Sequence, residues 1–186
     1  MGEQPLKLKH PKHAINAGIV LIPEERRREG LFIEESISIN TSFPNLKKFS
    51  IATFMSNKKE VSFAQEVIKK LGVKAYNSQT PMTSLSGGNQ QKVAIGKWLS
   101  HESKLYIFDE PTKGVDIGAK EDIFNTIREV ASEGKGVIYL SSEIHEILLI
   151  ADRILVMYDG QIVKSLTREE ATQEKILLYA SGGKEE

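Results

Sequence analysis

The chain has 186 residues, a formal net charge of zero and no cysteine. A chain of this length can bury a core, and we expect one domain with room for a subdomain. The zero net charge provides no overall field toward nucleic acid or an anionic membrane, and the lack of cysteine excludes a disulfide framework and a thiolate metal site. The longest uninterrupted apolar run, residues 147–151, is far shorter than the roughly twenty residues that cross a bilayer.

The first hundred residues change from a polar start to a helical pattern. Residues 1–17 begin basic and polar without periodicity, and we expect a tail or the remnant of an upstream lobe. Residues 18–23 form an apolar, β-branched run that stops at Pro23, which predicts a buried strand. From about residue 31 to residue 100 the pattern is mainly helical, with apolar residues at helical spacing over 61–71 and a capping glycine at Gly72. This pattern predicts a helical subdomain.

Three small residues, Ser86, Gly87 and Gly88, precede a run with apolar periodicity and are called here the Ser-Gly-Gly turn. Ser86 is a good N-cap, because its oxygen accepts from the free amides of a first helical turn. The two glycines leave those amides reachable, and the start of a helix carries a partial positive charge. The turn therefore suits a phosphate group.

After the Ser-Gly-Gly turn, predicted strands alternate with predicted helices. An apolar strand over 105–109 ends in the carboxylates Asp109 and Glu110. A helix over about 117–131, a strand over 136–140, a short helix over 143–151 and a strand over 153–157 follow. This alternation implies an α/β fold with a largely parallel sheet. An Asp-Gly pair at 159–160 predicts a hairpin, and Thr167 with Glu170 predicts a capping box for a last helix that runs to about residue 180.

The Ser-Gly-Gly turn, followed about twenty residues later by the strand that ends in Asp-Glu-Pro-Thr, resembles the ATP-binding cassette (ABC) ATPases. In that family a signature motif, a Walker B strand and an aspartate-containing loop occur in this order. The resemblance covers residues 18–163 and implies a P-loop NTPase sheet with an inserted helical subdomain that carries the signature. It implies a partial ABC ATPase domain over 18–186, with the helical subdomain at about 31–100 and the sheet core and C-terminal helix at 18–30 and 101–186.

The resemblance also assigns roles to individual residues. Asp109 matches the carboxylate that holds Mg²⁺, and Glu110 matches the glutamate that orients or deprotonates the attacking water. Asp116 matches an aspartate at the contact between two cassettes. The residues that would cap the γ-phosphate of ATP held by the opposite cassette are Ser86, Gly87, Gly88 and Gln90.

Two positions depart from the family pattern. Glu24 stands where the family has a glutamine that touches the metal and the water, and Ser142 stands where it has a histidine that contacts the γ-phosphate. His145, three residues later, is expected on the surface of the short helix. We interpret residues 26–28, three arginines, as a solvated charge run, with a cluster facing nucleotide or a partner as the alternative.

The sequence contains no G-x-x-x-x-G-K-S/T loop, which in this family cradles the phosphates upstream of residue 24. We therefore expect the chain to be the later two-thirds of a cassette without its phosphate-binding lobe. Without that loop, the isolated chain is expected to hydrolyse ATP negligibly.

Three segments narrow the resemblance: residues 85–97, residues 111–120, and Ser-Ser-Glu at 141–143 followed by Asp152 and Arg153. They look like the second, C-terminal cassette of bacterial ribose- and galactose-type importers. This implies ATP and Mg²⁺ as cofactors of the complete protein, and a second cassette, transmembrane permease subunits and, indirectly, a sugar-binding protein as partners, with no nucleic acid. It also implies a peripheral location on the cytoplasmic face of the cell membrane.

Two other classes of function stay open from the sequence. A DNA-repair or chromosome-maintenance ATPase also carries a signature and a Walker B strand, although the zero net charge and the absence of coiled-coil heptads oppose it. A non-catalytic interaction module would keep the fold without nucleotide, although the intact pair Asp109 and Glu110 opposes it.

Overall fold

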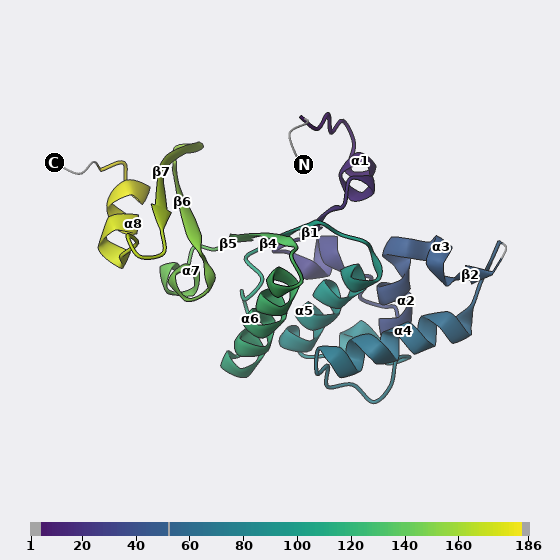
Figure 1. Cartoon of the computed structure of the whole chain (residues 1–186). Coiled ribbons are helices and arrows are strands. Elements are labelled where there is room, and N and C mark those ends of the chain that lie inside the picture. The colour runs from purple at the N-terminus through teal and green to yellow at the C-terminus, as the bar shows by residue number, and fades with distance from the viewer. Residues whose placement is uncertain (1–4, 52, 184–186) are drawn as a thin grey trace. The chain divides into compact units, whose positions relative to one another are not determined.

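Two units divide the chain in the computed structural model, residues 1–138 and residues 139–186, and the structure describes residues 5–51 and 53–183. Figure 1 shows the elements along the chain. The elements of the first unit are α1 (Pro11–Asn16), β1 (Ile19–Ile22), η1 (Arg26–Gly30), α2 (Ile37–Ser42), η2 (Phe43–Asn45), α3 (Leu46–Phe49), β2 (Ser50–Ile51), β3 (Phe54–Met55), α4 (Asn57–Lys70), η3 (Met82–Ser84), α5 (Gly87–Gly96), η4 (Lys97–Ser100), β4 (Leu105–Asp109) and α6 (Ile117–Ser132). Strand β5 (Gly136–Leu140) crosses the boundary, and α7 (Ile144–Ile150), β6 (Arg153–Tyr158), β7 (Gln161–Thr167) and α8 (Gln173–Ala180) follow it.

The main sheet has the strand order β1-β4-β5. β1 pairs with β4 in parallel, in a register that runs from Ile19 opposite Leu105 to Ile22 opposite Phe108. The predicted α/β fold with a parallel sheet is therefore confirmed. Along β1 the side chains alternate between the two faces. Val20 and Ile22 are buried, and Leu21 between them is 48% exposed.

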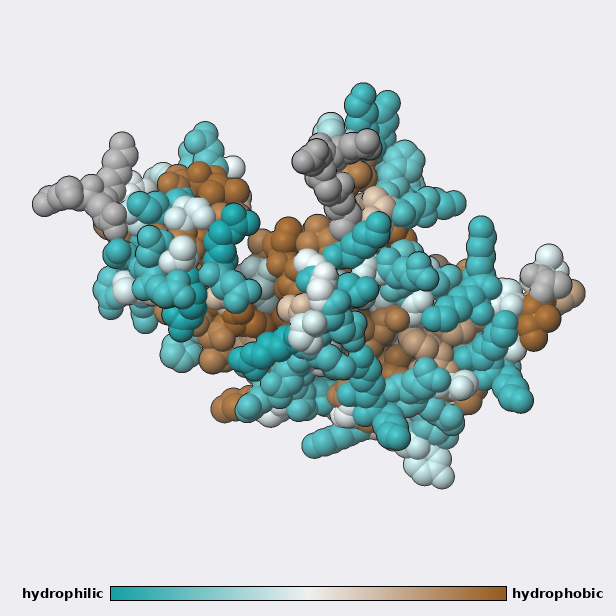
Figure 2. Space-filling view, viewed as in Figure 1, coloured by the Kyte–Doolittle hydropathy of each residue, from teal (hydrophilic) through white to brown (hydrophobic). Residues whose placement is uncertain are grey.

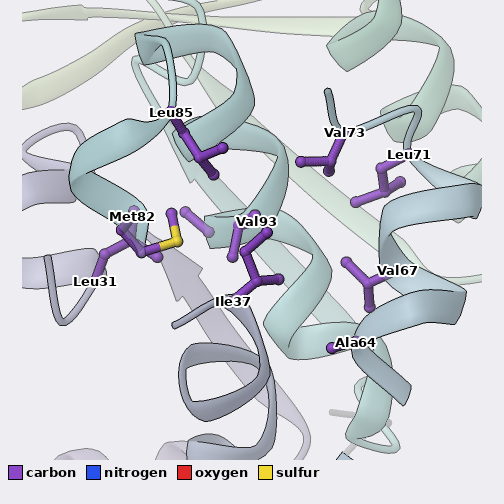
Figure 3. Packing of buried hydrophobic residues seen from close by; sticks show 10 residues of the cluster. Leu31, Ile37, Ala64, Val67, Leu71, Val73, Met82, Leu85 and Val93 are labelled. Carbon is purple, nitrogen blue, oxygen red and sulfur yellow. The ribbon is translucent and has the colours of Figure 1, made fainter. Parts of the chain in front are cut away.

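The helical region packs around one apolar cluster, shown in Figure 3. The buried members come from α2, α4, α5, η3 and the segments beside them: Leu31, Ile37, Ala64, Val67, Leu71, Val73, Met82, Leu85, Val93 and Ala94. Helix α4 carries the periodic residues that predicted it, and Gly72 follows it with a φ of +58°, as a C-terminal glycine cap requires. This cluster fixes α5, and therefore the Ser-Gly-Gly turn at its start, against the rest of the unit.

Two short elements differ from the sequence prediction. The region expected to be a tail contains α1, which has Pro11 in its first turn and is capped by His10, whose Nδ1 accepts from Lys12 N at 3.2 Å. The region expected to be mainly helical contains an antiparallel hairpin, β2–β3, in which Ile51 lies opposite Phe54. Strands of two residues are too short for an alternating pattern to reveal them.

The second unit is built on the antiparallel pair β6–β7. Asp159 and Gly160 connect the strands with φ values of 46° and 73°, the conformation of a type I′ turn, which confirms the predicted hairpin. The predicted capping box also forms, with Thr167 N donating to Glu170 Oε2 at 2.9 Å, but it closes a turn before the helix. Helix α8 instead begins after Thr172, whose hydroxyl accepts from Lys175 N at 3.2 Å.

In the part of the chain that the structure describes, no helix is long and apolar enough to span a membrane.

Candidate functional site

The Ser-Gly-Gly turn begins helix α5 in the predicted way. Ser86 is the N-cap, with φ −62° and ψ 159°, and its hydroxyl accepts from Asn89 Nδ2 at 2.9 Å and, more weakly, from Asn89 N at 3.5 Å. Ser86 is exposed, Gly87 is half-buried and Gly88 is buried. The serine end of the turn therefore faces solvent, at the positively polarised start of a ten-residue helix.

Both glycines are closely packed, and Gly88 is required at its position. A Cβ on Gly87 would lie 2.7 Å from Arg26 Nη2 and 3.1 Å from the carbonyl oxygen of Gly114. A Cβ on Gly88 would lie 2.5 Å from the Cβ of Ala119 in α6. The separations of 2.5 and 2.7 Å are shorter than ordinary contacts between non-bonded heavy atoms. The end of the Arg26 side chain can move aside, whereas the Cβ of Ala119 is fixed to the backbone of α6. The turn is thus fitted against η1, the loop after β4, and α6.

Gln90, the fourth residue of α5, points inward. It is fully buried, and its Nε2 donates to Met82 O at 2.9 Å and to Leu85 O at 3.2 Å. Its Oε1 accepts from Arg27 Nε at 3.1 Å. The Gln90 amide therefore supports the segment that leads into the turn, and this geometry favours a structural role over the predicted phosphate contact.

Glu24 and the arginines after it contact the loop that follows β4. The Glu24 carboxylate forms an ion pair with Lys113, which raises the pKa of the lysine through the side-chain hydrogen bond and the carboxylate charge. Arg26 Nη1 donates to the carbonyl oxygen of Lys113 at 3.2 Å. The interpretation of residues 26–28 as a solvated run is therefore wrong for Arg26, which is half-buried and bonded to Lys113. Arg27 and Arg28 are exposed, although Arg27 also bonds to Gln90.

The adjacent carboxylates lie at the end of β4. Asp109 is the last residue of the strand, and both it and Glu110 are half-buried. Glu110 has a φ of +44°, in the left-handed region that non-glycine residues rarely occupy. Such a conformation costs on the order of 1–3 kcal/mol and is found most often at functional sites.

Asp116 is the N-cap of α6, where its Oδ1 accepts from Ala119 N at 3.0 Å. This backbone hydrogen bond lowers the pKa of the carboxyl. Asp116 also lines a cavity of about 300 Å³ beside the Ser-Gly-Gly turn. The other lining residues are Lys74, Ser86, Asn89, Lys92, Gly118, Ala119 and Asp122. The structure thus places Asp116 next to Ser86 and Gly88.

Ser142 belongs to the second unit, in the turn between β5 and α7, and its side chain is exposed. His145, in the first turn of α7, is also exposed, as expected.

The residues present fit a Mg²⁺ ion that is shared with a phosphate. Among the described residues, no three His, Asp or Glu side chains gather into a metal cage. Mg²⁺ is usually held by one or two carboxylates together with substrate phosphates and water, so a strand-end carboxylate such as Asp109 suffices. The exposed Ser86 and the positively polarised start of α5 suit a phosphate group.

Sequence reasoning missed the side chains that join these segments. Arg26, Arg27 and Lys113 connect residue 24, the loop after β4 and α5. Lys92, buried in α5, reaches Gly72 O at 3.1 Å and Asp122 of α6 at 2.7 Å. A signal for the first group existed in the arginine run itself, but nothing local distinguishes a bonded arginine from a solvated one.

A model of the family described as ABC transporter matches residues 4–113, more than half of the chain. Among curated proteins, the chain is 45% identical over 185 residues to the ribose import ATP-binding protein RbsA of Caldanaerobacter subterraneus, and 42% identical over 177 residues to that of Bacillus subtilis. It is also 45% identical over 180 residues to an import ATP-binding protein of Rhizobium etli named for ribose, galactose and methyl galactoside. These matches cover 95–98% of this chain but only 34–37% of the relatives, so the chain spans about a third of their length.

Two solved structures share the fold. One is a dimeric ATP-binding cassette in a post-hydrolysis state with ADP and Pi, and the other is a dimeric bacterial ABC transporter cassette. Each has a TM-score of 0.71 at 21% identity, and the match covers 87% of this chain and 68% of the other.

Proposed function

Because the chain belongs to the ABC transporter family, we propose that it forms part of the ATP-hydrolysing subunit of a bacterial importer of ribose or a related sugar. The main support for this proposal is that the family match agrees with the arrangement of the chain. The Ser-Gly-Gly turn, the β4 carboxylates and Asp116 all lie within one unit. The relatives are named import ATP-binding proteins, which supports transport. The DNA-repair interpretation has no support among them.

In this proposal the chain supplies halves of two different nucleotide sites. Ser86 and the amides of Gly87 and Gly88 donate to the γ-phosphate of ATP that a second cassette holds. Asp116, beside the same turn, lies at the contact between the cassettes. Gln90 keeps the turn in position through its bonds to residues 82 and 85.

The other half-site lies at the end of β4. When ATP and Mg²⁺ are bound, the metal neutralises the phosphate charge. Asp109 would hold that ion and Glu110 would orient the attacking water. Glu24 stands at the glutamine position of the family and Ser142, in the second unit, at its histidine position. The ion pair between Glu24 and Lys113 turns Glu24 toward the loop after β4, which supports weak catalysis at this half-site.

An upstream lobe would supply the phosphate loop and would cover the exposed face of the sheet. Parallel sheets are usually covered on both faces, and the 48% exposure of Leu21 on one face supports such a lobe. Transmembrane permease subunits and, through them, a sugar-binding protein complete the system, with this chain at the cytoplasmic side of the membrane.

The proposal is tested by a chimera in which the chain replaces the matching part of the Bacillus subtilis ribose import ATP-binding protein. We expect the chimera to restore ribose uptake in cells that lack that protein. Ser86→Ala should reduce uptake by at least tenfold, because a donor to the phosphate is lost. Ser84→Ala, at a neighbouring exposed serine, is the matched control.

Two results would contradict the proposal. One is a stably produced chimera that fails to support uptake. The other is uptake that survives Ser86→Ala and Glu110→Gln alike. The second result, or a soluble chain that neither binds nucleotide nor joins a second cassette, would favour the non-catalytic interaction module.

A further inference from the structure

The β2–β3 hairpin ends in exposed apolar side chains. Phe54 is 80% exposed and Ile51 is 62% exposed. They lie opposite each other in the ladder, so both side chains are on one face of the hairpin. Figure 1 shows the hairpin projecting beyond α3 and α4, and Figure 2 shows brown atoms at this end of the unit beside long teal side chains. Adjacent exposed apolar side chains on a projection indicate a contact surface.

The hairpin has a firm base. Phe49, just before β2, is 3% exposed and packs on Phe63 of α4, with ring centroids 5.3 Å apart. Ser56 N donates to Phe49 O at 2.8 Å, and Lys59 Nζ donates to Ser50 O at 3.1 Å. The base of the hairpin is therefore anchored to the core of the helical region.

Exposed lysines surround the hairpin on both sides. Lys47 and Lys48 precede it, Lys58 and Lys59 follow it, and all four are exposed. Over residues 45–60 these four cations are set against one acidic residue, Glu60, so this segment carries a net charge of +3 within a chain whose net charge is zero. The Glu60 carboxylate bonds to Ser42 Oγ at 2.5 Å and is turned toward α2. Positive charge is thus concentrated around the apolar end.

We propose that this tip, defined as Ile51, Phe54 and the flanking Lys47 and Lys58, inserts into the surface of an anionic lipid membrane; the ammonium groups of Lys48 and Lys59 bond to Ser100 O and Ser50 O instead. An apolar end flanked by lysines matches the interface, where apolar side chains enter the acyl boundary and lysine stems keep their ammonium groups among the headgroups. A narrow projecting hairpin offers far less area than the roughly 800 Å² per partner of a stable protein interface. The contact is weak and reversible, and it adds to any attachment through other proteins.

The inference does not depend on the proposed function, because its test contains no permease. The purified chain is mixed with vesicles of phosphatidylcholine that contain 30% phosphatidylglycerol, and the bound fraction is measured by flotation. We expect binding that weakens as salt is raised, and little binding to phosphatidylcholine alone. Ile51→Ser with Phe54→Ser should weaken partitioning about tenfold or more. Lys47→Gln with Lys58→Gln should weaken it about fivefold for each lysine removed.

Matched variants distinguish binding through the tip from nonspecific binding by other exposed side chains. Tyr76→Ser removes an aromatic side chain that is 96% exposed, and Lys9→Gln with Lys69→Gln removes two exposed lysines elsewhere in the unit. These variants should bind as the unaltered chain does. Trp98 fluorescence and circular dichroism confirm that each variant folds. Equal binding to both kinds of vesicle, or unchanged binding by the tip variants, would each overturn the lipid contact.

Discussion

The replacement Gly88→Ala tests whether the contact between α5 and α6 fixes the Ser-Gly-Gly turn. The new Cβ would lie 2.5 Å from the Cβ of Ala119, more than 1 Å inside the usual contact distance between carbon atoms. Ala119 is 8% exposed and lies on the packed face of α6. The two helices must therefore separate, or the turn must shift.

The cost follows from two opposing effects. Overpacking in a well-packed core costs about 1–3 kcal/mol, whereas alanine is favoured over glycine inside a helix by up to about 1 kcal/mol. The net loss in free energy of unfolding is about 1–2 kcal/mol. With a urea m-value of about 2 kcal/mol per M, the midpoint should fall by about 0.5–1 M.

Urea unfolding followed by the fluorescence of Trp98, the single tryptophan, reports this loss within the first unit. Gly118→Ala is the matched control: it occupies the same position in α6 as Gly88 does in α5, but its Cβ would meet only Asp116 Oδ1, at 3.4 Å. Adding Ala119→Gly to Gly88→Ala should recover most of the loss caused by the clash. An unchanged midpoint for Gly88→Ala, or no recovery in the double variant, would refute the reasoning.

Three further predictions use the same unfolding assay. Gln90→Ala should cost about 2–4 kcal/mol, since it leaves a cavity and two carbonyls without their donor, and a loss under about 0.5 kcal/mol would contradict the supporting role. Glu110→Gly should stabilise the chain by about 0.5–1 kcal/mol by relieving the left-handed strain while ribose uptake by the chimera falls; destabilisation would show that the strain is absent. Burial lowers the pKa of Lys97 from 10.5 to about 8, so the unfolded chain binds more protons between those pH values. The free energy of unfolding should rise by about 1–3 kcal/mol between pH 8 and pH 10.5, and Lys97→Met should remove that rise.

Local patterns predicted the elements that local chemistry determines. Ser86 caps its helix as expected, and the pair Asp159–Gly160 forms the hairpin turn, because each depends only on neighbouring residues. The Thr167–Glu170 box shows the limit of such patterns. Its hydrogen bonds form, but β7 continues through Thr167 and Thr172 provides a second cap, so the helix begins later than predicted.

The missed parts of the site depend on contacts between distant segments. The pairing of Glu24 with Lys113 and of Arg27 with Gln90 requires η1, the loop after β4 and α5 to meet, which no local periodicity encodes. The inward orientation of Gln90 follows from the core beneath α5. The sequence therefore predicted which segments would carry the chemistry, whereas only the packing shows which of their side chains, such as Gln90, point into the protein and which are exposed.

Arg26 and Gly87 are far apart in the sequence but pack against each other, so changes at these two positions depend on one another. A side chain at residue 87 would be tolerated best in a lineage in which residue 26 is already short, because the end of the Arg26 side chain would otherwise have to move aside. One order of the two changes is therefore favoured. A recombinant made from related genes should therefore take residues 26 and 87 from the same parent. A crossover between these positions would combine two residues that were not selected to pack against each other.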